Sequence, residues 1–273
     1  AEITILTEPA VTTEAVTTVI ATEETATETT AETTVATTTE ETTTVTTAEA
    51  TTTTTTIATT VATTAKPAPE KSPHVPSVLD GEYTFSGEPV IENVDGFTYV
   101  NGILIVNKTY SVPESFNPQE LHPEAKAAFD LMKIDAAAEG IALKIISGFR
   151  PYSQQESTYN NYCKRDGKEL ADRYSARPGH SEHQSGLAMD VNSLRQSFGE
   201  TKEGLWLAEH AADYGFIIRY GKEKESCTGF MYEPWHIRYV GKDVAQAIKD
   251  TGAAIGDPYL TMEEYFDIDS IYR

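Results

Sequence analysis

Two separate segments of the sequence contain side chains that can bind a metal ion. In the first, SEHQSGLAMD, six residues separate His183 from Asp190, and Gly186 between them permits a turn that brings the two side chains together. An imidazole nitrogen and a carboxylate oxygen are both suitable zinc ligands. Because most histidine–aspartate pairs at such a spacing are ordinary surface or core residues, this segment alone is a weak indication of a metal site.

The second segment, EPWH, places Glu233 three residues before His236 within an apolar, aromatic run. A buried charge is costly unless it is paired or bound to a metal, and a kink at Pro234 would bring both side chains into one cavity. In a catalytic zinc site, three protein ligands leave one position for water, and a free carboxylate nearby accepts a proton from that water. The alternative is an ion pair of Glu233 with Arg219 or Arg238, beside a hydrogen-bonded core histidine.

A third group, SGFR, places Arg150 at the end of a predicted strand. The paired donors of an arginine in this position can hold a carboxylate or a developing oxyanion. Gln155 follows about one helical turn later and could share that contact. A lone arginine after a strand is more often structural, so this group gains meaning only beside the other two.

The elements that must position these residues combine hairpins with helices. Asn101-Gly102, between FTYV and ILIV, predicts a two-residue hairpin. Helices are predicted over about 123–139, 153–165, 202–214 and 243–250 and from 261, with a buried strand over 143–147 and further strands ending at 191, over 216–219 and within 230–240. The apolar spacing of the first helix is carried by Ala127, Leu131, Ile134 and Ala138. Strands and helices do not alternate regularly, which favours an α+β fold with a small mixed or antiparallel sheet flanked by helices.

Composition divides the chain into three parts. Residues 1–65 consist almost entirely of Thr, Ala, Glu and Val, without an aromatic residue, glycine, lysine or arginine. Such a segment cannot bury enough apolar surface to offset the entropy of ordering it, so we predict a disordered stalk. Residues 66–78 are predicted to form a Pro-rich hinge of extended character, and residues 79–273 a single folded domain.

The charge of the chain restricts its partners. The formal net charge is −21, and because residues 1–65 contain ten glutamates and no basic residue, −11 remains on the rest. There is no basic stripe, so we do not expect nucleic acid as a partner. No apolar run reaches the roughly 18–20 residues that span a membrane, and the sequence contains no n-region and h-region of a signal peptide. We therefore expect a mature form without its signal or anchor segment, and a monomer.

Taken together, the three groups resemble the VanY-type zinc D-alanyl-D-alanine carboxypeptidases and their L,D-carboxypeptidase relatives. The resemblance rests on the pattern Ser-x-His-x-x-Gly-x-Ala-x-Asp, with Glu-x-x-His downstream and Ser-Gly-Phe-Arg upstream. The longer segments RPGHSEHQSGLAMDV, YGFIIRYGKEKESCTGFMYEPWHIRYVG and LTMEEY are similar as well. It covers roughly residues 96–265 and does not include the stalk.

This resemblance assigns a role to each candidate residue. It implies that Zn²⁺ is bound by His183, Asp190 and His236, with Glu233 as the catalytic base, Arg150 stabilising the tetrahedral intermediate or positioning the scissile carbonyl, and Ser181 and Gln155 contacting the terminal D-residue. His180 has the same chemistry as His183 and lies three residues before it. Spacing does not distinguish the two histidines, whereas the family pattern selects His183.

The implied activity is removal of the C-terminal D-alanine from peptidoglycan stem peptides. We favour a D,D-carboxypeptidase, with L,D cleavage of tetrapeptide stems as the alternative. Peptidoglycan is then the expected partner, and the expected location is extracellular or at a bacterial cell wall. The remaining alternatives are an endopeptidase, a non-catalytic cell-wall binding module and a stalked adhesin with a structural zinc ion.

Two cysteines lie outside the family pattern. In an oxidising compartment Cys163 and Cys227 could pair, and we hypothesise a disulfide that joins the helix after Arg150 to the loop before Glu233. The alternative is a pair of isolated buried thiols.

Overall fold

The computed structural model describes His74 and residues 88–272. The predicted stalk, the hinge apart from His74, and the predicted start of the domain at residue 79 lie outside the described residues, so these three predictions are untested. In the part that is described, no helix combines the length and the apolar character needed to cross a membrane. The strands are β1 (Ile91–Val94), β2 (Phe97–Val100), β3 (Ile103–Ile105), β4 (Ile145–Ser147), β5 (Ala188–Val191), β6 (Phe216–Tyr220) and β7 (Glu233–Tyr239). The helices are α1 (Pro123–Ala138), α2 (Tyr152–Asp166), α3 (Lys168–Ala171), α4 (Lys202–His210), α5 (Glu225–Thr228), α6 (Lys242–Ile255) and α7 (Met262–Phe266), with 3₁₀ turns η1 (Glu182–Ser185), η2 (Gln196–Glu200) and η3 (Ala211–Tyr214).

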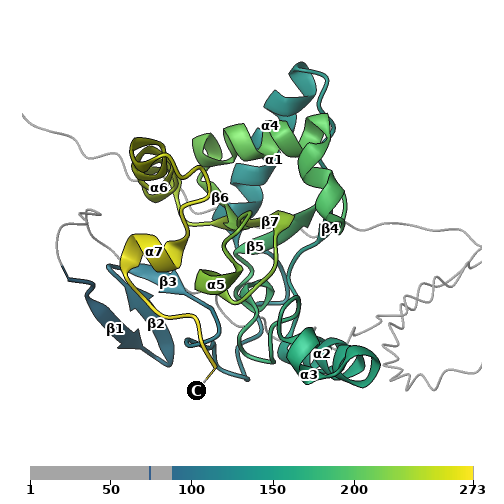
Figure 1. Ribbon diagram of the computed structural model, residues 1–273, viewed down its shortest axis with the longest axis vertical. Coiled ribbons are helices and arrows are strands. Elements are labelled where there is room, and N and C mark those ends of the chain that lie inside the picture. Colours follow the sequence, from purple (N-terminus) through teal and green to yellow (C-terminus); the bar gives the residue numbers. More distant parts are fainter. Residues whose placement is uncertain (1–73, 75–87, 273) are drawn as a thin grey trace, which may run out of the picture. The chain divides into compact units, whose positions relative to one another are not determined.

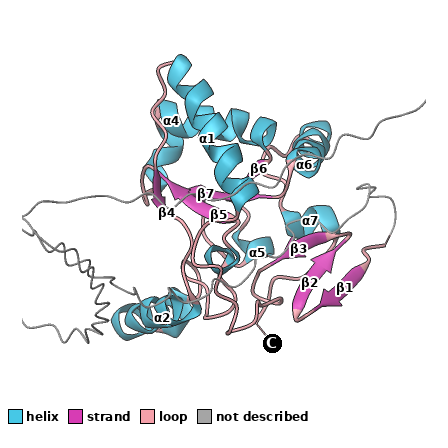
Figure 2. Cartoon of the chain, turned by 180° about the vertical axis from the view of Figure 1, so that it is seen from behind, coloured by secondary structure: helices cyan, strands magenta, loops and turns pink. Residues whose placement is uncertain are grey.

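The strands form two separate antiparallel sheets. One has the order β1-β2-β3 and the other β4-β5-β7-β6. Helices α1, α4 and α6 lie on one side of the four-stranded sheet, and α2, α3 and α5 lie on the opposite side (Figures 1 and 2). This arrangement confirms the predicted α+β fold with small sheets flanked by helices.

The predicted hairpin is present between β2 and β3. Asn101 and Gly102 both have positive φ, +49° and +79°, as a two-residue turn of the favoured kind requires. A second turn with the same backbone conformation, Asp95-Gly96, has φ of +52° and +84° and joins β1 to β2; strand β1 was not predicted. The short ribbon therefore has three strands.

The expected apolar face of α1 was wrong. Leu131 and Ile134 are 50% and 66% exposed. The helix instead buries Ala125, Phe129, Met132 and Ala136 against the sheet. Both sets have helical spacing, and the set that contains Phe129 buries the larger aromatic surface.

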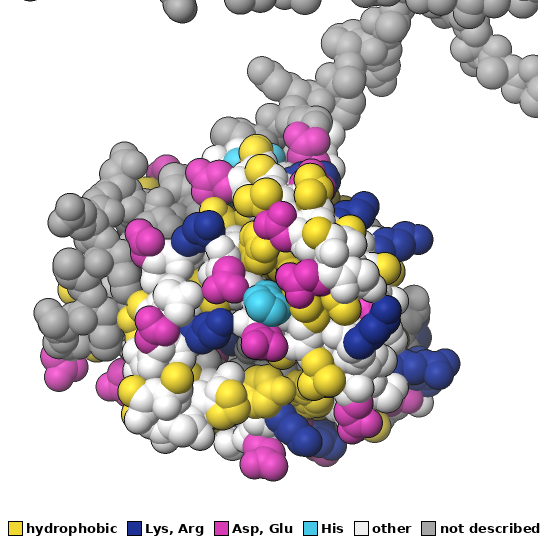
Figure 3. Space-filling model, turned by 90° about the horizontal axis from the view of Figure 1, so that it is seen from above, with side chains coloured by type: hydrophobic (Ala, Val, Ile, Leu, Met, Phe, Trp, Pro, Cys, Tyr) yellow, Lys and Arg dark blue, Asp and Glu magenta, His cyan; other side chains and the backbone are white. Residues whose placement is uncertain are grey.

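Acidic, basic and apolar side chains are interspersed on the face seen in Figure 3.

The strand predicted over 143–147 begins later, at Ile145, and lies at the edge of its sheet. Because β4 has a neighbour on one side only, it is not a buried strand, and Ile146 is 42% exposed. The loop that follows leads directly to Arg150.

Alternation along the central strands separates the core from the site. Met189 on β5 and Ile237 on β7 are fully buried and belong to the core that also contains α1 and α4. Because successive side chains of a strand point to opposite faces, Asp190 and His236 lie on the face away from these helices.

Candidate metal centre

Three of the predicted site residues converge on the non-helical face of the central strands. Asp190 pairs directly with His236 across β5 and β7, and Asp190 Oδ1 lies 3.3 Å from His236 Nδ1. Asp190 Oδ2 lies 3.3 Å from Nε2 of His183. All three residues are buried, and one candidate ligand atom from each lies within 4.8 Å of the other two.

His183 is carried by η1, which ends in a tight turn. Gly186 terminates this element with φ of +76°, and a Cβ atom at that position would lie 2.9 Å from the carbonyl oxygen of Glu120. Only glycine meets both requirements, so the turn returns the chain to β5 as the sequence predicted. His183 Nδ1 lies 2.7 Å from the carbonyl oxygen of Gly148. As donor in that hydrogen bond, Nδ1 carries the proton and Nε2 presents its lone pair to the centre.

His236 is oriented in the same manner through its opposite nitrogen. Its Nε2 lies 3.1 Å from Oε2 of Glu182, which leaves Nδ1 to face Asp190. Asp190 Oδ1 is buried and accepts no hydrogen bond, a state that is costly for a carboxylate oxygen. A cation between the three side chains would supply the missing interaction. Two imidazole nitrogens and one carboxylate fit zinc with a fourth position open.

A bulge in β7 brings Glu233 to the same side. Strict alternation would place Glu233 on the core face together with Ile237. A step of two residues along β6, from Ile218 to Tyr220, instead matches a step of four along β7, from Ile237 to Glu233. Bulges of this kind redirect side chains, and this one contains Pro234, where the sequence predicted a kink.

Burial dominates the electrostatics of Glu233. It raises the pKa of this carboxyl to about 8, against the lowering effect of His236 and with a further rise from Asp190. Burial lowers the pKa of His236, but the neighbouring carboxylates of Asp190 and Glu182 outweigh this effect and raise the pKa to about 9. Burial raises the pKa of Asp190, but His183 and His236 outweigh this effect and hold the pKa of Asp190 well below its usual range. A bound cation would favour the deprotonated form of each of these groups.

Arg150 is held at the edge of the centre by two hydrogen bonds. Its Nη1 donates to Oε1 of Gln155 at 2.7 Å, and its Nη2 donates to Oγ of Ser147 at 2.9 Å. Gln155 is 1% exposed and also donates through Nε2 to the carbonyl oxygen of Ala176 at 2.6 Å. The guanidinium is therefore fixed in direction before any ligand arrives.

All seven predicted site residues line one cavity of about 320 Å³: Arg150, Gln155, Ser181, His183, Asp190, Glu233 and His236. Tyr162, Tyr174 and Trp235 contribute aromatic surface to its wall. His180 is used elsewhere, since its Nδ1 lies 2.9 Å from the carbonyl oxygen of Asn107 and its ring packs on Tyr272. His183, and not His180, thus lies beside Asp190 and His236.

Glu182 was missed by the sequence analysis. The sequence allowed an ion pair of Glu233 with Arg219 or Arg238. In the structure it is Glu182 that pairs with these arginines, contacting Arg219 Nε at 2.7 Å and Arg238 Nη1 at 2.9 Å. The signal available in the sequence was a glutamate placed directly before His183.

The hypothesised disulfide is not formed, because both cysteines are free. Cys227 Sγ on α5 lies 3.4 Å from a carboxylate oxygen of Glu264, whereas Cys163 on α2 interacts with Tyr159 of its own helix. The two thiols thus have different partners on different elements.

Comparisons with known proteins identify the family of this chain. Residues 118–242 match the VanY family, described as D-alanyl-D-alanine carboxypeptidase. The putative carboxypeptidase YodJ of Bacillus subtilis (strain 168) is 38% identical over 205 residues, which are 65% of this chain and 72% of that protein. The chain belongs to the VanY family.

Solved structures place this VanY-family protein among carboxypeptidases of two kinds. The LdcB LD-carboxypeptidase has a TM-score of 0.59 and 41% identity, covering 67% of this chain and 98% of that one. The vancomycin resistance D,D-pentapeptidase VanY, solved in complex with Zn(II), has a TM-score of 0.50 and 29% identity, covering 59% and 96%. The VanY-family protein is accordingly a hydrolase of the carboxypeptidase type.

Proposed function

We propose that this protein is a zinc-dependent carboxypeptidase that removes the C-terminal D-alanine from peptidoglycan stem peptides outside the bacterial cell. The observation that carries the proposal is the convergence of His183, Asp190 and His236 beside Glu233 and Arg150 in one cavity. The Zn(II) complex of the related VanY structure supports the choice of metal.

Zinc held by His183, Asp190 and His236 would polarise the scissile carbonyl and lower the pKa of water at the open position to about 7. Asp190 contributes one negative charge, so the set of three ligands keeps a net positive charge once the ion is bound. The hydrogen bonds to the outer nitrogens of both histidines hold the rings in the required direction.

Glu233 moves the protons of the reaction. As a carboxylate it accepts a proton from the attacking water while the oxygen of that water bonds to the carbonyl carbon. It then donates the same proton to the nitrogen of the departing D-alanine, as the carbon–nitrogen bond breaks. A carboxyl whose pKa is raised by burial is suited to both steps, because it holds and releases a proton near neutral pH.

Arg150 and Ser181 would contact the substrate. The guanidinium of Arg150 carries donors on a fixed fork and stabilises negative charge that develops on the carbonyl oxygen. Ser181 lines the same cavity and is assigned to the terminal D-residue. Gln155 hydrogen bonds to Arg150 and Ala176 at its two ends, so its contribution to binding passes through Arg150.

The preferred stem peptide is a separate part of the proposal. The sequence favoured D,D cleavage of a pentapeptide, and relatives of both kinds match, so that preference is untested. The identity of 41% with the LD-carboxypeptidase against 29% with the D,D-pentapeptidase supports L,D cleavage. We therefore propose the tetrapeptide as the better substrate and the pentapeptide as the second candidate.

The test is to incubate the purified full chain with tetrapeptide and pentapeptide stems, with and without a chelator, and to measure product masses. Loss of one alanine that chelation abolishes and zinc restores is the expected result. The Glu233→Gln variant serves as the inactive control. Zinc-bound protein that cleaves neither peptide would overturn the carboxypeptidase, and faster cleavage of the pentapeptide would overturn the proposed preference.

A further inference from the structure

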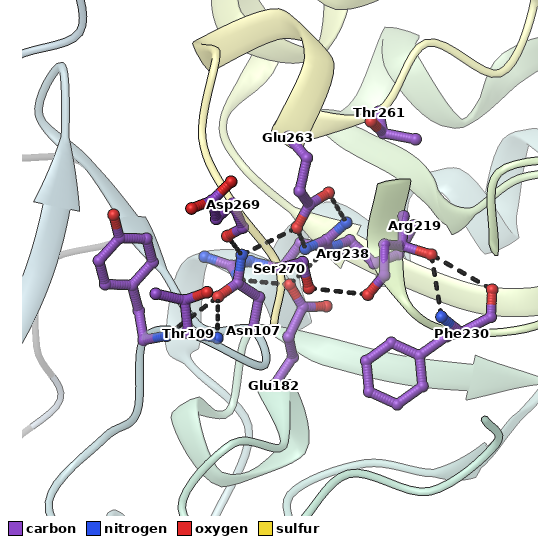
Figure 4. A network of polar contacts seen from close by, with 12 residues as sticks. Asn107, Thr109, Glu182, Arg219, Phe230, Arg238, Thr261, Glu263, Asp269 and Ser270 are labelled. Atoms are coloured by element: carbon purple, nitrogen blue, oxygen red, sulfur yellow. Dashed lines mark hydrogen bonds and ion pairs between the residues drawn. The ribbon is translucent and has the colours of Figure 1, made fainter. Parts of the chain in front are cut away.

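Glu182 lies at the centre of a buried network of charges behind the metal centre. It is 1% exposed, and its oxygen Oε1 accepts hydrogen bonds from Arg219 Nε and Arg238 Nη1. Arg219 donates in addition to both oxygens of Glu263, at 2.7 and 2.6 Å. Figure 4 shows the two arginine side chains between the carboxylates of Glu182 and Glu263. Two negative and two positive groups thus balance within the protein interior.

The two oxygens of Glu182 have different partners. Both arginines bind Oε1, whereas Oε2 lies 3.1 Å from Nε2 of His236. An ionised carboxylate only accepts hydrogen bonds, so the hydrogen on this contact must belong to the histidine. In the neutral form that can bind a metal ion, His236 therefore carries its proton on Nε2, and Nδ1, which faces Asp190 and Glu233, has a lone pair.

We propose that Glu182 is a positioning residue that fixes the ring direction and the tautomer of His236 so that Nδ1 can bind the metal. The two arginines prevent Glu182 from rotating, because turning the carboxylate away would leave two buried guanidinium groups without their shared acceptor. The inference rests on the proposed function, since it requires that His236 binds a metal ion.

Replacing Glu182 with glutamine tests this role alone, because the volume of the side chain changes little. The two arginines both donate, so they require the amide oxygen of the new side chain at the position of Oε1. The amide nitrogen then takes the position of Oε2 and directs a second donor at Nε2 of His236. The imidazole can accept that bond only by moving its own proton to Nδ1, which removes the lone pair from the metal centre.

A control variant is available within the same network. Glu263 is 3% exposed and pairs with the same Arg219, but its contacts do not include His236. Glu263→Gln therefore disturbs the buried charges to a similar extent without reversing the hydrogen bond to the histidine.

The experiment measures zinc affinity of the full chain by competition with a chromophoric chelator, after circular dichroism has established that each variant is folded. Glu182→Gln is expected to weaken zinc binding by about 10- to 100-fold, and Glu263→Gln by less than about threefold. Equal losses in both variants, or a Glu182→Gln affinity within about threefold of wild type, would overturn the proposal. Wild-type protein that does not bind zinc would instead overturn the proposed function, and the present inference with it.

A second measurement needs no variant and decides the matter if Glu182→Gln does not fold. In ¹⁵N-edited spectra of the zinc-loaded wild-type protein, His236 should carry its proton on Nε2, and His183 should carry its proton on Nδ1. The Nε2 proton of His236 should be shifted downfield, as expected for a hydrogen bond to a carboxylate. A proton on Nδ1 of His236, or an Nε2 proton without that downfield shift, would overturn the role of Glu182.

Discussion

Glu233 Oε2 lies 3.8 Å from His236 Nδ1, the nitrogen that also faces Asp190. The carboxyl of Glu233 thus borders the candidate metal centre from a bulge of β7, while the three proposed metal ligands form a set of their own. A group placed in this way can transfer protons at the centre without being required to hold the ion.

The variant Glu233→Gln is accordingly expected to keep its zinc and lose turnover. General base catalysis of this kind contributes about 10²- to 10⁴-fold, so kcat should fall by that factor. Metal content by mass spectrometry and kcat on the tetrapeptide stem are the two measurements. Near-normal turnover, or loss of the metal together with activity, would contradict the separation of roles.

The zinc-free protein should become less stable as the pH rises from about 6.5 to 9. Glu233, with a folded pKa of about 8 against 4.5, keeps a proton that the unfolded chain has lost, so its contribution to stability declines up to about pH 8. His236, with about 9 against 6.5, contributes stability below pH 6.5 that is lost as the pH rises through 9. Each group changes the free energy of unfolding by about 1.4 kcal/mol per pH unit between its two values.

Thermal unfolding in the presence of a chelator measures this effect. The melting temperature of wild type should fall between pH 6.5 and 8 more steeply than that of Glu233→Gln, which lacks one of the two titrating groups. Zinc affinity should rise over the same interval, because the ligands bind in their deprotonated form. Parallel melting curves for the two proteins would contradict the assignment of Glu233.

Arg150→Lys should lower kcat by about 10²- to 10³-fold without releasing zinc, because an ammonium group has no planar fork to occupy both Gln155 and Ser147 while facing the substrate. Arg173→Lys is the matched control, since Arg173 pairs with Glu225 at the surface and does not line the cavity. Kinetics on the tetrapeptide stem compare the two variants. Equal activity of Arg150→Lys and wild type would remove Arg150 from the reaction.

Gly186→Ala should destabilise the protein and weaken its zinc binding. A left-handed backbone costs a residue with a Cβ atom about 1–2 kcal/mol, and here the added atom also meets the carbonyl oxygen of Glu120. Gly140 has a similar φ of +74° with no neighbour within 4 Å of the added atom, so Gly140→Ala reports the conformational cost alone. Denaturant unfolding and zinc titration of both variants test the difference. Equal losses would mean that the contact at Gly186 is unimportant.

Reducing agent should leave the melting temperature of the protein unchanged, because Cys163 and Cys227 are free. The double variant Cys163→Ser, Cys227→Ser should behave like wild type within about 0.5 kcal/mol. A large loss of stability on reduction would show that the two thiols pair.

Local signals in the sequence were reliable where one residue type decides the conformation. Asn101-Gly102 gave the hairpin, and the Thr261–Glu264 pair forms a capping box at the start of α7, the last predicted helix. Gly186 predicted the turn between two proposed metal ligands, because few residues other than glycine adopt its backbone conformation.

Features that depend on the partner of a side chain were not predictable in this way. Leu131 and Phe129 mark two stripes of α1 with equal spacing, and only packing against the sheet selects the stripe of Phe129. Glu182 and Glu233 are two glutamates each close in sequence to a predicted ligand, and only the fold decides which one binds the arginines. The predicted disulfide between Cys163 and Cys227 was wrong for the same reason, since the pairing of the two thiols depends on where α2 and α5 lie.

The ion pair between Arg219 and Glu263 also determines when the metal centre can form during synthesis of the chain. Glu263 belongs to α7, the last helix of the described chain, while Glu182 and His236 precede it in sequence. A nascent chain emerges from the ribosome with its N-terminal part first, so Arg219 lacks one of its two carboxylate partners until α7 has been synthesised. We therefore expect the metal centre to mature only after nearly the whole domain has been synthesised, and chains shortened before α7 to lack a competent centre.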